Sequence, residues 1–204
     1  MALKPALKVW FDFNCPYCHT AGGWIRNLEE QEALPFEPIW KAFSLENVNL
    51  PPEGDADELW ARPEERRGLL PLAISKWAES EGPETFGRVF GGFLQACHEE
   101  GKKIGKPEVC AEVLNAVGLE GTPVVDRVLG DRKWLDSARS DYEEGRELGV
   151  FGVPTLVFPD AKPIYMKMNE ITENERAVEL FEKVQAIATD STLQELKRPS
   201  PPRR

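Results

Sequence analysis

The sequence predicts an α/β fold in which a sheet-containing domain is split by an all-helical block. Strand patterns occur near the two ends of the chain, at residues 7–13, 36–43, 154–158 and 163–168, where apolar runs lie between turn residues. From about residue 63 to 145 the pattern is helical, with apolar residues three and four positions apart. The predicted order is therefore β-α-β, then several helices, then β-β-α.

The composition describes an acidic protein with an ordinary core. The chain has 204 residues, of which 41% are hydrophobic, so it is long enough for one large domain or for a domain carrying an insertion. A net charge of −10 argues against nonspecific binding to nucleic acid. No stretch is apolar over the length that a bilayer requires. We therefore expect neither a nucleic-acid partner nor a membrane partner.

The first strand and the helix after it carry the clearest local signals. Alternation over residues 7–13 places apolar side chains on two faces, with Val9, Phe11 and Phe13 on one and Trp10 on the other. Asn14 is predicted to cap the helix, which has Pro16 in its first turn and ends near residue 32. In the second strand, Pro38 indicates an edge strand or a bulge.

The rest of the chain is predicted by turn residues and helical spacing. Residues 49–63 are predicted to form a loop whose acidic side chains either are solvated or hold a metal ion. Helices are predicted at residues 69–77, 86–97, 108–117 and 132–148, and the last of these ends at Gly149. A final helix over residues 172–188 would have Thr172 as its cap and Glu175 as its capping-box partner.

These elements predict a division into domains. Residues 1–48 and 150–190 would form the split sheet domain, and residues 58–148 the helical insertion. Residues 191–204 are predicted to be a disordered tail with a basic end.

The motif Cys15-Pro16-Tyr17-Cys18 is the most informative part of the sequence. It stands between a strand and a helix, which is the layout of a dithiol redox site. The free N–H groups and the positive dipole end of the helix would stabilise an anion, so the Cys15 sulfur should ionise more readily than an ordinary thiol. We expect Cys15 at the exposed start of the helix as the nucleophile. Cys18, one turn further in, should be more buried and less acidic, and it would resolve the mixed disulfide.

Two other interpretations of the cysteine pair stay open. A pair with this spacing is also half of a zinc site, and His19, Cys97 and Cys110 would be the remaining ligands in a chain with 4 Cys and 2 His. The pair could also be an inert structural one. Residues 1–5 lead directly into the first strand without a secretory signal pattern. We therefore expect a cytoplasmic protein, in which a cysteine pair is more often catalytic than structural.

Two motifs together resemble the DsbA-like branch of the thioredoxin superfamily. They are Phe11-Asp12-Phe13-Asn14-Cys15-Pro16-Tyr17-Cys18 and Gly149-Val150-Phe151-Gly152-Val153-Pro154-Thr155, and the resemblance spans residues 7–188. Within the branch the chain looks most similar to FrnE-like proteins, mycothiol-linked reductases and relatives of hydroxychromene-carboxylate isomerase. It departs from the isomerases, which typically have serine first and lack the second cysteine. The resemblance implies a thioredoxin-like fold with a central mixed sheet and a thiol-disulfide oxidoreductase activity.

The resemblance also implies roles around the cysteine pair. Pro154 would follow a cis peptide bond and pack against the cysteines, and Val153 would offer free backbone groups to an extended substrate. An ordinary trans proline that opens a strand is the alternative. Pro16 and Tyr17 would set the redox potential. His19, four residues after Cys15, would lower the thiol pKa or simply face solvent.

Partners and cofactors follow from the same resemblance. We expect no tightly bound cofactor, but a low-molecular-weight thiol, glutathione or mycothiol, as co-substrate. The partners would be a thiol or disulfide substrate, either a protein or a small molecule, and a thioredoxin-type electron donor, with the chain a monomer or a homodimer. Two other function classes stay open: a thiol-dependent transferase or isomerase that acts on small aromatic substrates, and a non-catalytic chaperone or binding module.

Several further residues have two interpretations each. Asp12 would relay a proton or anchor a loop. Cys97 and Cys110 would be a second redox pair or small buried apolar residues. The large aromatic residues would line a substrate groove or belong to the core; they are Trp24, Trp40, Trp60, Trp77 and Phe93.

Overall fold

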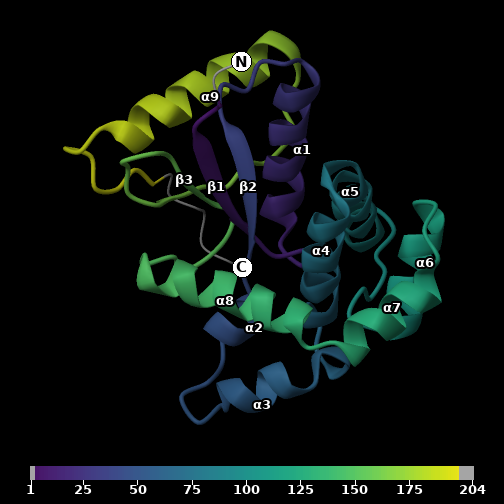
Figure 1. Cartoon of the computed structure of the whole chain (residues 1–204). Coiled ribbons are helices and arrows are strands. Elements are labelled where there is room, and N and C mark those ends of the chain that lie inside the picture. The colour runs from purple at the N-terminus through teal and green to yellow at the C-terminus, as the bar shows by residue number, and fades with distance from the viewer. Residues whose placement is uncertain (1–2, 198–204) are drawn as a thin grey trace, which may run out of the picture.

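This computed structural model describes residues 3–197. At its centre is a four-stranded mixed sheet (Figure 1). The strands are β1 (Ala6–Phe11), β2 (Glu37–Ala42), β3 (Thr155–Val157) and β4 (Ile164–Tyr165). The order across the sheet is β2-β1-β3-β4; β1 and β2 are parallel, and β3 is antiparallel to both of its neighbours. The α/β prediction is confirmed. Because β2 is an edge strand, it tolerates Pro38 opposite Leu7.

The helices surround the sheet and form a group beside it. Within the sheet domain and its connections they are α1 (Pro16–Glu30), α2 (Leu45–Val48), α3 (Ala56–Ala61), α8 (Lys133–Glu147) and α9 (Asn174–Thr189). The inserted group consists of α4 (Leu69–Glu81), α5 (Pro83–His98), α6 (Pro107–Ala116) and α7 (Gly121–Gly130), preceded by a 3-10 turn, η1 (Pro63–Glu65). In Figure 1, α9 crosses above the strands and α8 below them. No helix within residues 3–197 is long and apolar enough to span a bilayer.

Helices lie on both faces of the sheet, and tryptophan side chains hold them in place. The Trp10 indole donates a hydrogen bond of 2.9 Å to the Asp141 carbonyl of α8. A Cβ atom on Gly145 would lie 2.6 Å from Trp10 Nε1, so glycine permits this close approach of α8. On the other face, α1 packs against α9, and Trp24 donates a hydrogen bond of 3.0 Å to the Ala177 carbonyl.

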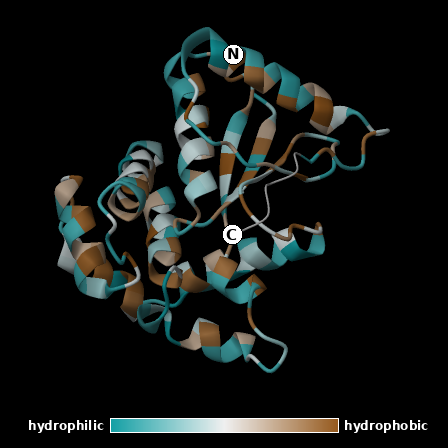
Figure 2. Ribbon diagram, turned by 180° about the vertical axis from the view of Figure 1, so that it is seen from behind, coloured by the Kyte–Doolittle hydropathy of each residue, from teal (hydrophilic) through white to brown (hydrophobic). Residues whose placement is uncertain are grey.

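Aromatic side chains join the sheet to the inserted helices. Phe90 of α5 lies 5.1 Å from Phe11 and 4.4 Å from Trp40, measured between ring centroids, and Phe93 lies 5.2 Å from Phe13. Edge-to-face and tilted contacts of this kind add to the free energy that burial already provides. Figure 2 shows the hydrophilic residues that cover much of α8 on the outside. Because of these aromatic contacts, the sheet and the inserted helices share one hydrophobic core. The predicted boundaries of the two domains stay a prediction.

Two local predictions are wrong, and one helix within the predicted helical region was missed. The loop over residues 49–63 contains α3, because the Asp55 side chain accepts hydrogen bonds from the N–H groups of Asp57 and Glu58 and so caps a short helix. Helix α7 was not predicted separately. The capping box of the last helix does not form. Helix α9 begins one residue later than predicted, with Glu173 at its N-cap. The Thr172 hydroxyl is buried without a hydrogen-bond partner among the described residues.

The predicted tail is only partly described. Residues 191–197 contain a turn and no helix or strand, and their side chains are exposed. Residues 198–204, with the basic end, lie outside the described residues.

A buried carboxylate ties β2, α4 and α8 together. Asp141 lies 2.9 Å from Lys41 and 2.8 Å from Lys76, and it accepts a hydrogen bond of 3.1 Å from the Ala42 N–H. Burial acts to lower the pKa of Lys41, but hydrogen bonds to Asp141 and Glu144 outweigh it and raise that pKa above its usual value. Each lysine also pairs with a glutamate, Lys41 with Glu144 and Lys76 with Glu79, but Asp141 is the buried carboxylate that both lysines share.

We predict that Asp141→Asn lowers the free energy of unfolding by about 3 kcal/mol, since it leaves two largely buried ammonium groups without their shared counterion. Urea unfolding followed by circular dichroism measures this. The matched control is Asp136→Asn, on the same helix, whose side chain is 60% exposed and 3.5 Å from Arg132; its effect should stay under about 0.5 kcal/mol. Equal effects of the two substitutions would contradict the importance of the buried network.

Candidate active site

Cys15 occupies the N-cap position of α1, at the end of the turn that follows β1. Its backbone is extended, with φ −90° and ψ 116°, and Pro16 follows at the first helical position as predicted. Asn14, the predicted cap, is held outside the helix because its backbone and side-chain N–H groups both donate to Asp12 Oδ1, at 2.9 and 3.2 Å. The Cys15 sulfur therefore stands where a capping oxygen usually lies, facing the first N–H groups of the helix.

The segment before β3 covers the sulfur from the other side. The Val153–Pro154 peptide bond is cis, and Cys15 Sγ donates a hydrogen bond of 3.2 Å to the Val153 carbonyl. The Thr155 hydroxyl donates to the Gly152 carbonyl at 2.7 Å and fastens this segment. As a result Cys15 is only 5% exposed. The expectation of an exposed sulfur is wrong, because a segment 138 residues away in sequence packs over the start of α1.

The two cysteines have opposite ionisation properties. The Cys18 thiol donates to the Cys15 sulfur and lowers the pKa of Cys15; burial opposes this, and the N–H groups of Cys18 and Tyr17 lower the pKa further. Burial raises the pKa of Cys18 well above that of an ordinary thiol, and the neighbouring Cys15 raises it more. Cys18 is 1% exposed. The arrangement favours a thiolate at Cys15 and a protonated thiol at Cys18.

Asp12 anchors the loops that carry the site. Besides its hydrogen bonds to Asn14, its second oxygen accepts a hydrogen bond of 2.8 Å from the Leu45 N–H. Burial raises the pKa of Asp12, although these hydrogen bonds act to lower it. The carboxyl group thus fixes the turn before Cys15 to the start of α2, as the anchoring interpretation expects.

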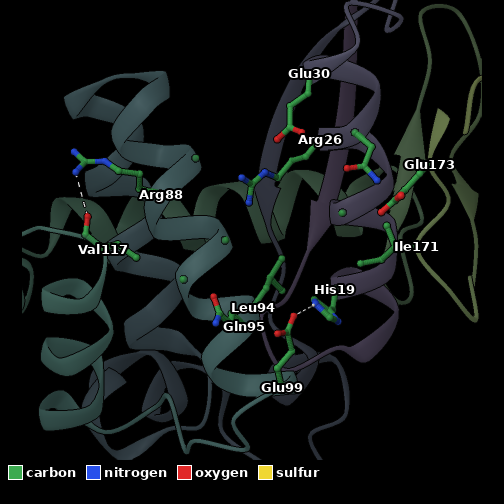
Figure 3. Close-up of a pocket in the computed structure, with 15 residues that line it drawn as sticks. His19, Arg26, Glu30, Arg88, Leu94, Gln95, Glu99, Val117, Ile171 and Glu173 are labelled. Carbon is green, nitrogen blue, oxygen red and sulfur yellow. Dashed lines mark hydrogen bonds and ion pairs between the residues drawn. The ribbon is translucent and has the colours of Figure 1, made fainter.

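His19 faces α5 rather than the Cys15 sulfur. Its Nε2 lies 3.2 Å from Glu99 Oε1, and its ring stacks on His98 with centroids 5.3 Å apart. Figure 3 shows His19 and Glu99 at the lower end of a cleft between α1 and α5, which has a volume of about 460 Å³. Arg26 also points into this cleft. His19 and the cysteines share a helix, but the imidazole is engaged elsewhere.

The other two cysteines, Cys97 and Cys110, form no disulfide with each other or with the motif. All four cysteines are free thiols. Cys110 is buried and donates to the Ile104 carbonyl at 2.9 Å, and burial raises its pKa far above the usual value. Burial also raises the pKa of the half-buried Cys97. Within residues 3–197, no three histidine, cysteine or acidic side chains gather closely enough to hold a metal ion.

The large aromatic residues that were candidates for a groove lie in the core. Their exposed fractions are at most 8%, so the core interpretation is confirmed for Trp24, Trp40, Trp60, Trp77 and Phe93. The aromatic residues exposed near the cysteines are different ones. Phe151 is 65% exposed, and its ring lies 5.0 Å from that of Tyr165. The sequence offered one signal for Phe151: an aromatic residue between glycines, just before the cis-proline motif.

This chain is similar to proteins of a known family. A family model described as a DSBA-like thioredoxin domain matches residues 71–178, which is more than half of the chain. The chain belongs to this family. A relative from Mycobacterium tuberculosis, named as an uncharacterized protein, is 26% identical over 193 residues, covering 94% of this chain and 81% of its own length.

Solved structures of DsbA-like proteins have the same fold. A probable DsbA oxidoreductase from Streptomyces coelicolor is 16% identical, with a TM-score of 0.62 over 94% of this chain and 93% of its own. A 2-hydroxychromene-2-carboxylate isomerase is 15% identical, with a TM-score of 0.63 over 92% and 98%. The cytosolic disulfide reductase DsbM from Pseudomonas aeruginosa, solved with glutathione, is 14% identical, with a TM-score of 0.60 over 89% and 98%. The predicted thioredoxin-like fold is thereby confirmed.

We predict that Cys18→Ala raises the pKa of Cys15, because it removes the thiol that donates to the Cys15 sulfur. The measurement is the pH dependence of iodoacetamide alkylation of Cys15 in the reduced protein, read residue by residue by mass spectrometry. Cys97→Ala is the control and should leave the midpoint unchanged. A midpoint that is the same in wild type and Cys18→Ala would mean that Cys18 does not stabilise the thiolate.

We predict that His19→Ala leaves the pKa of Cys15 unchanged, because the imidazole pairs with Glu99 and His98 instead of the sulfur. The same alkylation profile tests this. A rise of the midpoint in His19→Ala would show that the histidine does tune the thiolate.

Proposed function

We propose that this protein is a cytoplasmic thiol-disulfide oxidoreductase, with Cys15 as nucleophile and Cys18 as resolving thiol. One observation carries the proposal: the Cys15 sulfur lies between the N-terminus of α1 and the Val153 carbonyl, with a lowered pKa, and a buried thiol of raised pKa stands behind it. A Cys15 thiolate in this position can attack the sulfur of a disulfide, while Cys18 stays protonated until the second step.

The reaction is two successive thiol-disulfide exchanges. The Cys15 thiolate attacks one sulfur of a substrate disulfide, forms a mixed disulfide, and releases the other substrate sulfur as a thiolate that takes up a proton. Cys18 then loses its proton and attacks Cys15, and the second substrate sulfur leaves. The substrate gains two electrons and two protons, and Cys15 and Cys18 become a disulfide. A dithiol substrate reverses each step.

Backbone groups beside the cis-proline would position the substrate. Within the described residues, the Val153 N–H has no hydrogen-bond partner, and its carbonyl binds only the Cys15 thiol. An extended peptide can pair with these groups while its sulfur meets Cys15. Pro16 supplies no N–H to the thiolate, and Tyr17 supplies one. Their exchange for other residues would therefore change the reduction potential.

The electrons would come from a low-molecular-weight thiol, such as glutathione or mycothiol, or from a thioredoxin-type protein. The fold likeness to a cytosolic disulfide reductase solved with glutathione supports the first source and the cytoplasmic compartment. In that compartment thiols are kept reduced, so net reduction of substrates is the expected direction.

We predict that Cys15→Ser reduces activity to the uncatalysed background, whereas Cys18→Ser accumulates mixed disulfides that cannot be resolved. The assay is glutathione-dependent reduction of a dye-labelled peptide disulfide, with mass spectrometry of the non-reduced protein. Cys97→Ser, outside the pair, should keep the wild-type rate.

Each other outcome supports a different function. Full activity in Cys15→Ser would contradict the assignment of the nucleophile. Thiol-dependent conversion of a small aromatic substrate that survives in Cys18→Ser would favour a transferase or isomerase, for which the fold likeness to the isomerase gives a reason to test. A wild-type pair that never exchanges with disulfides would favour a binding module.

A further inference from the structure

A row of three aromatic side chains and one lysine borders the active site. Phe151 contacts Tyr165 at 5.0 Å between ring centroids. Lys167 Nζ lies 5.7 Å from the centroid of Tyr165 and 5.1 Å from that of Tyr17. We call Phe151, Tyr165, Lys167 and Tyr17 the aromatic–lysine row. The row begins at Phe151, in the segment before the cis-proline, and passes Tyr165 of β4 and Lys167 just after it. It ends at Tyr17, which lies between the two cysteines in the sequence.

The lysine in this row has a defined place and an uncompensated charge. Two ring faces attract the ammonium group and restrict its position. The Lys167 side chain is exposed, and no carboxylate of residues 3–197 lies within 4.0 Å of its Nζ. Lys167 is therefore a local positive charge over the ring of Tyr17, the residue between the motif cysteines of a protein with a net charge of −10.

The aromatic end of the row presents apolar surface close to Val153 in the chain. Phe151 is 65% exposed although it is a large apolar residue, and it stands two positions before Val153 in the chain. A small thiol bound at Cys15 would cover little of it. A peptide paired with the Val153 backbone continues past the sulfur, and the row offers it Phe151 at one end and Lys167 over Tyr17 at the other.

We propose that the aromatic–lysine row selects peptide disulfides that carry an acidic residue next to the cysteine, with Lys167 as the residue that determines this specificity. This inference rests on the proposed function and names the substrate class of the same site. The negative charge of the protein repels acidic peptides over the distance of a Debye length, about 8 Å at physiological salt. An ammonium group held over the ring of Tyr17, between the two cysteines in the chain, would reverse that repulsion close to the point of attack.

The test compares three peptide disulfides that differ only in the residue after the cysteine, which is Glu, Gln or Lys. Wild-type protein should reduce the Glu peptide about fivefold faster than the Lys peptide in kcat/KM, the scale of an exposed ion pair, and the difference should shrink at high salt. Lys167→Glu should reverse the order, and Lys167→Arg should preserve it. Lys162→Glu, the same charge change in the connection between β3 and β4, is the control and should leave the order as in wild type.

The outcomes separate this inference from the proposed function. If no peptide is reduced by wild-type protein, the oxidoreductase activity fails and the inference with it. If all three are reduced equally, by wild type and by Lys167→Glu, the inference alone is overturned, because a purely structural role of Lys167 changes the three rates together and not their ratio. A Lys167→Glu effect confined to glutathione disulfide, offered in parallel, would overturn the choice of a peptide.

Discussion

The placement of the Cys15 sulfur at the N-cap of α1 governs the chemistry of this site. Three separate constraints produce it: the Asp12 carboxylate retains Asn14 outside the helix, Pro16 begins the first turn, and the Val153 carbonyl approaches from above. The first two fix the backbone around Cys15, and the third contacts its sulfur. The N–H groups and the Cys18 thiol favour a negative charge there, whereas the carbonyl binds the protonated form. Loss of the proton thus releases the sulfur from Val153 and makes the backbone of that residue available to a substrate.

The scaffold keeps these parts together from both faces of the sheet. On one side, α8 approaches Trp10 through Gly145, and the Asp141 carboxylate binds lysines from β2 and α4. Directly after α8 the chain turns at Gly149, whose φ of 84° suits glycine, and enters the cis-proline segment. The buried ion pairs of Asp141 hold α8 in place, and so they also fix the start of the segment that carries Val153 to the active site. On the other side, the ring of Phe90 fills the space between the sheet and the insertion.

Much of the fold and the centre of the site could be predicted because their signals are local. The cysteine motif, the strand before it and the long inserted helices each show in neighbouring residues. Two errors are local, the cap that Asp55 gives to α3 and the missing capping box of α9, and the errors in the site concern contacts between distant segments. Asn14 is a good capping residue, but Asp12 and the Arg67 carbonyl bind its side chain. His19 has the right spacing from Cys15, but α5 offers Glu99 and His98. Lys167 meets Tyr17 although the two residues lie far apart in the sequence, and no local pattern reveals that contact.

The central claim, that Cys15 and Cys18 are a redox-active pair, is tested most directly by equilibrating the protein in glutathione buffers of graded potential and quantifying each cysteine by mass spectrometry. The account predicts one reversible two-electron transition in which Cys15 and Cys18 change together, while Cys97 and Cys110 stay reduced. A transition at Cys97 or Cys110, or a Cys15–Cys18 pair that stays as thiols at every potential, would contradict it.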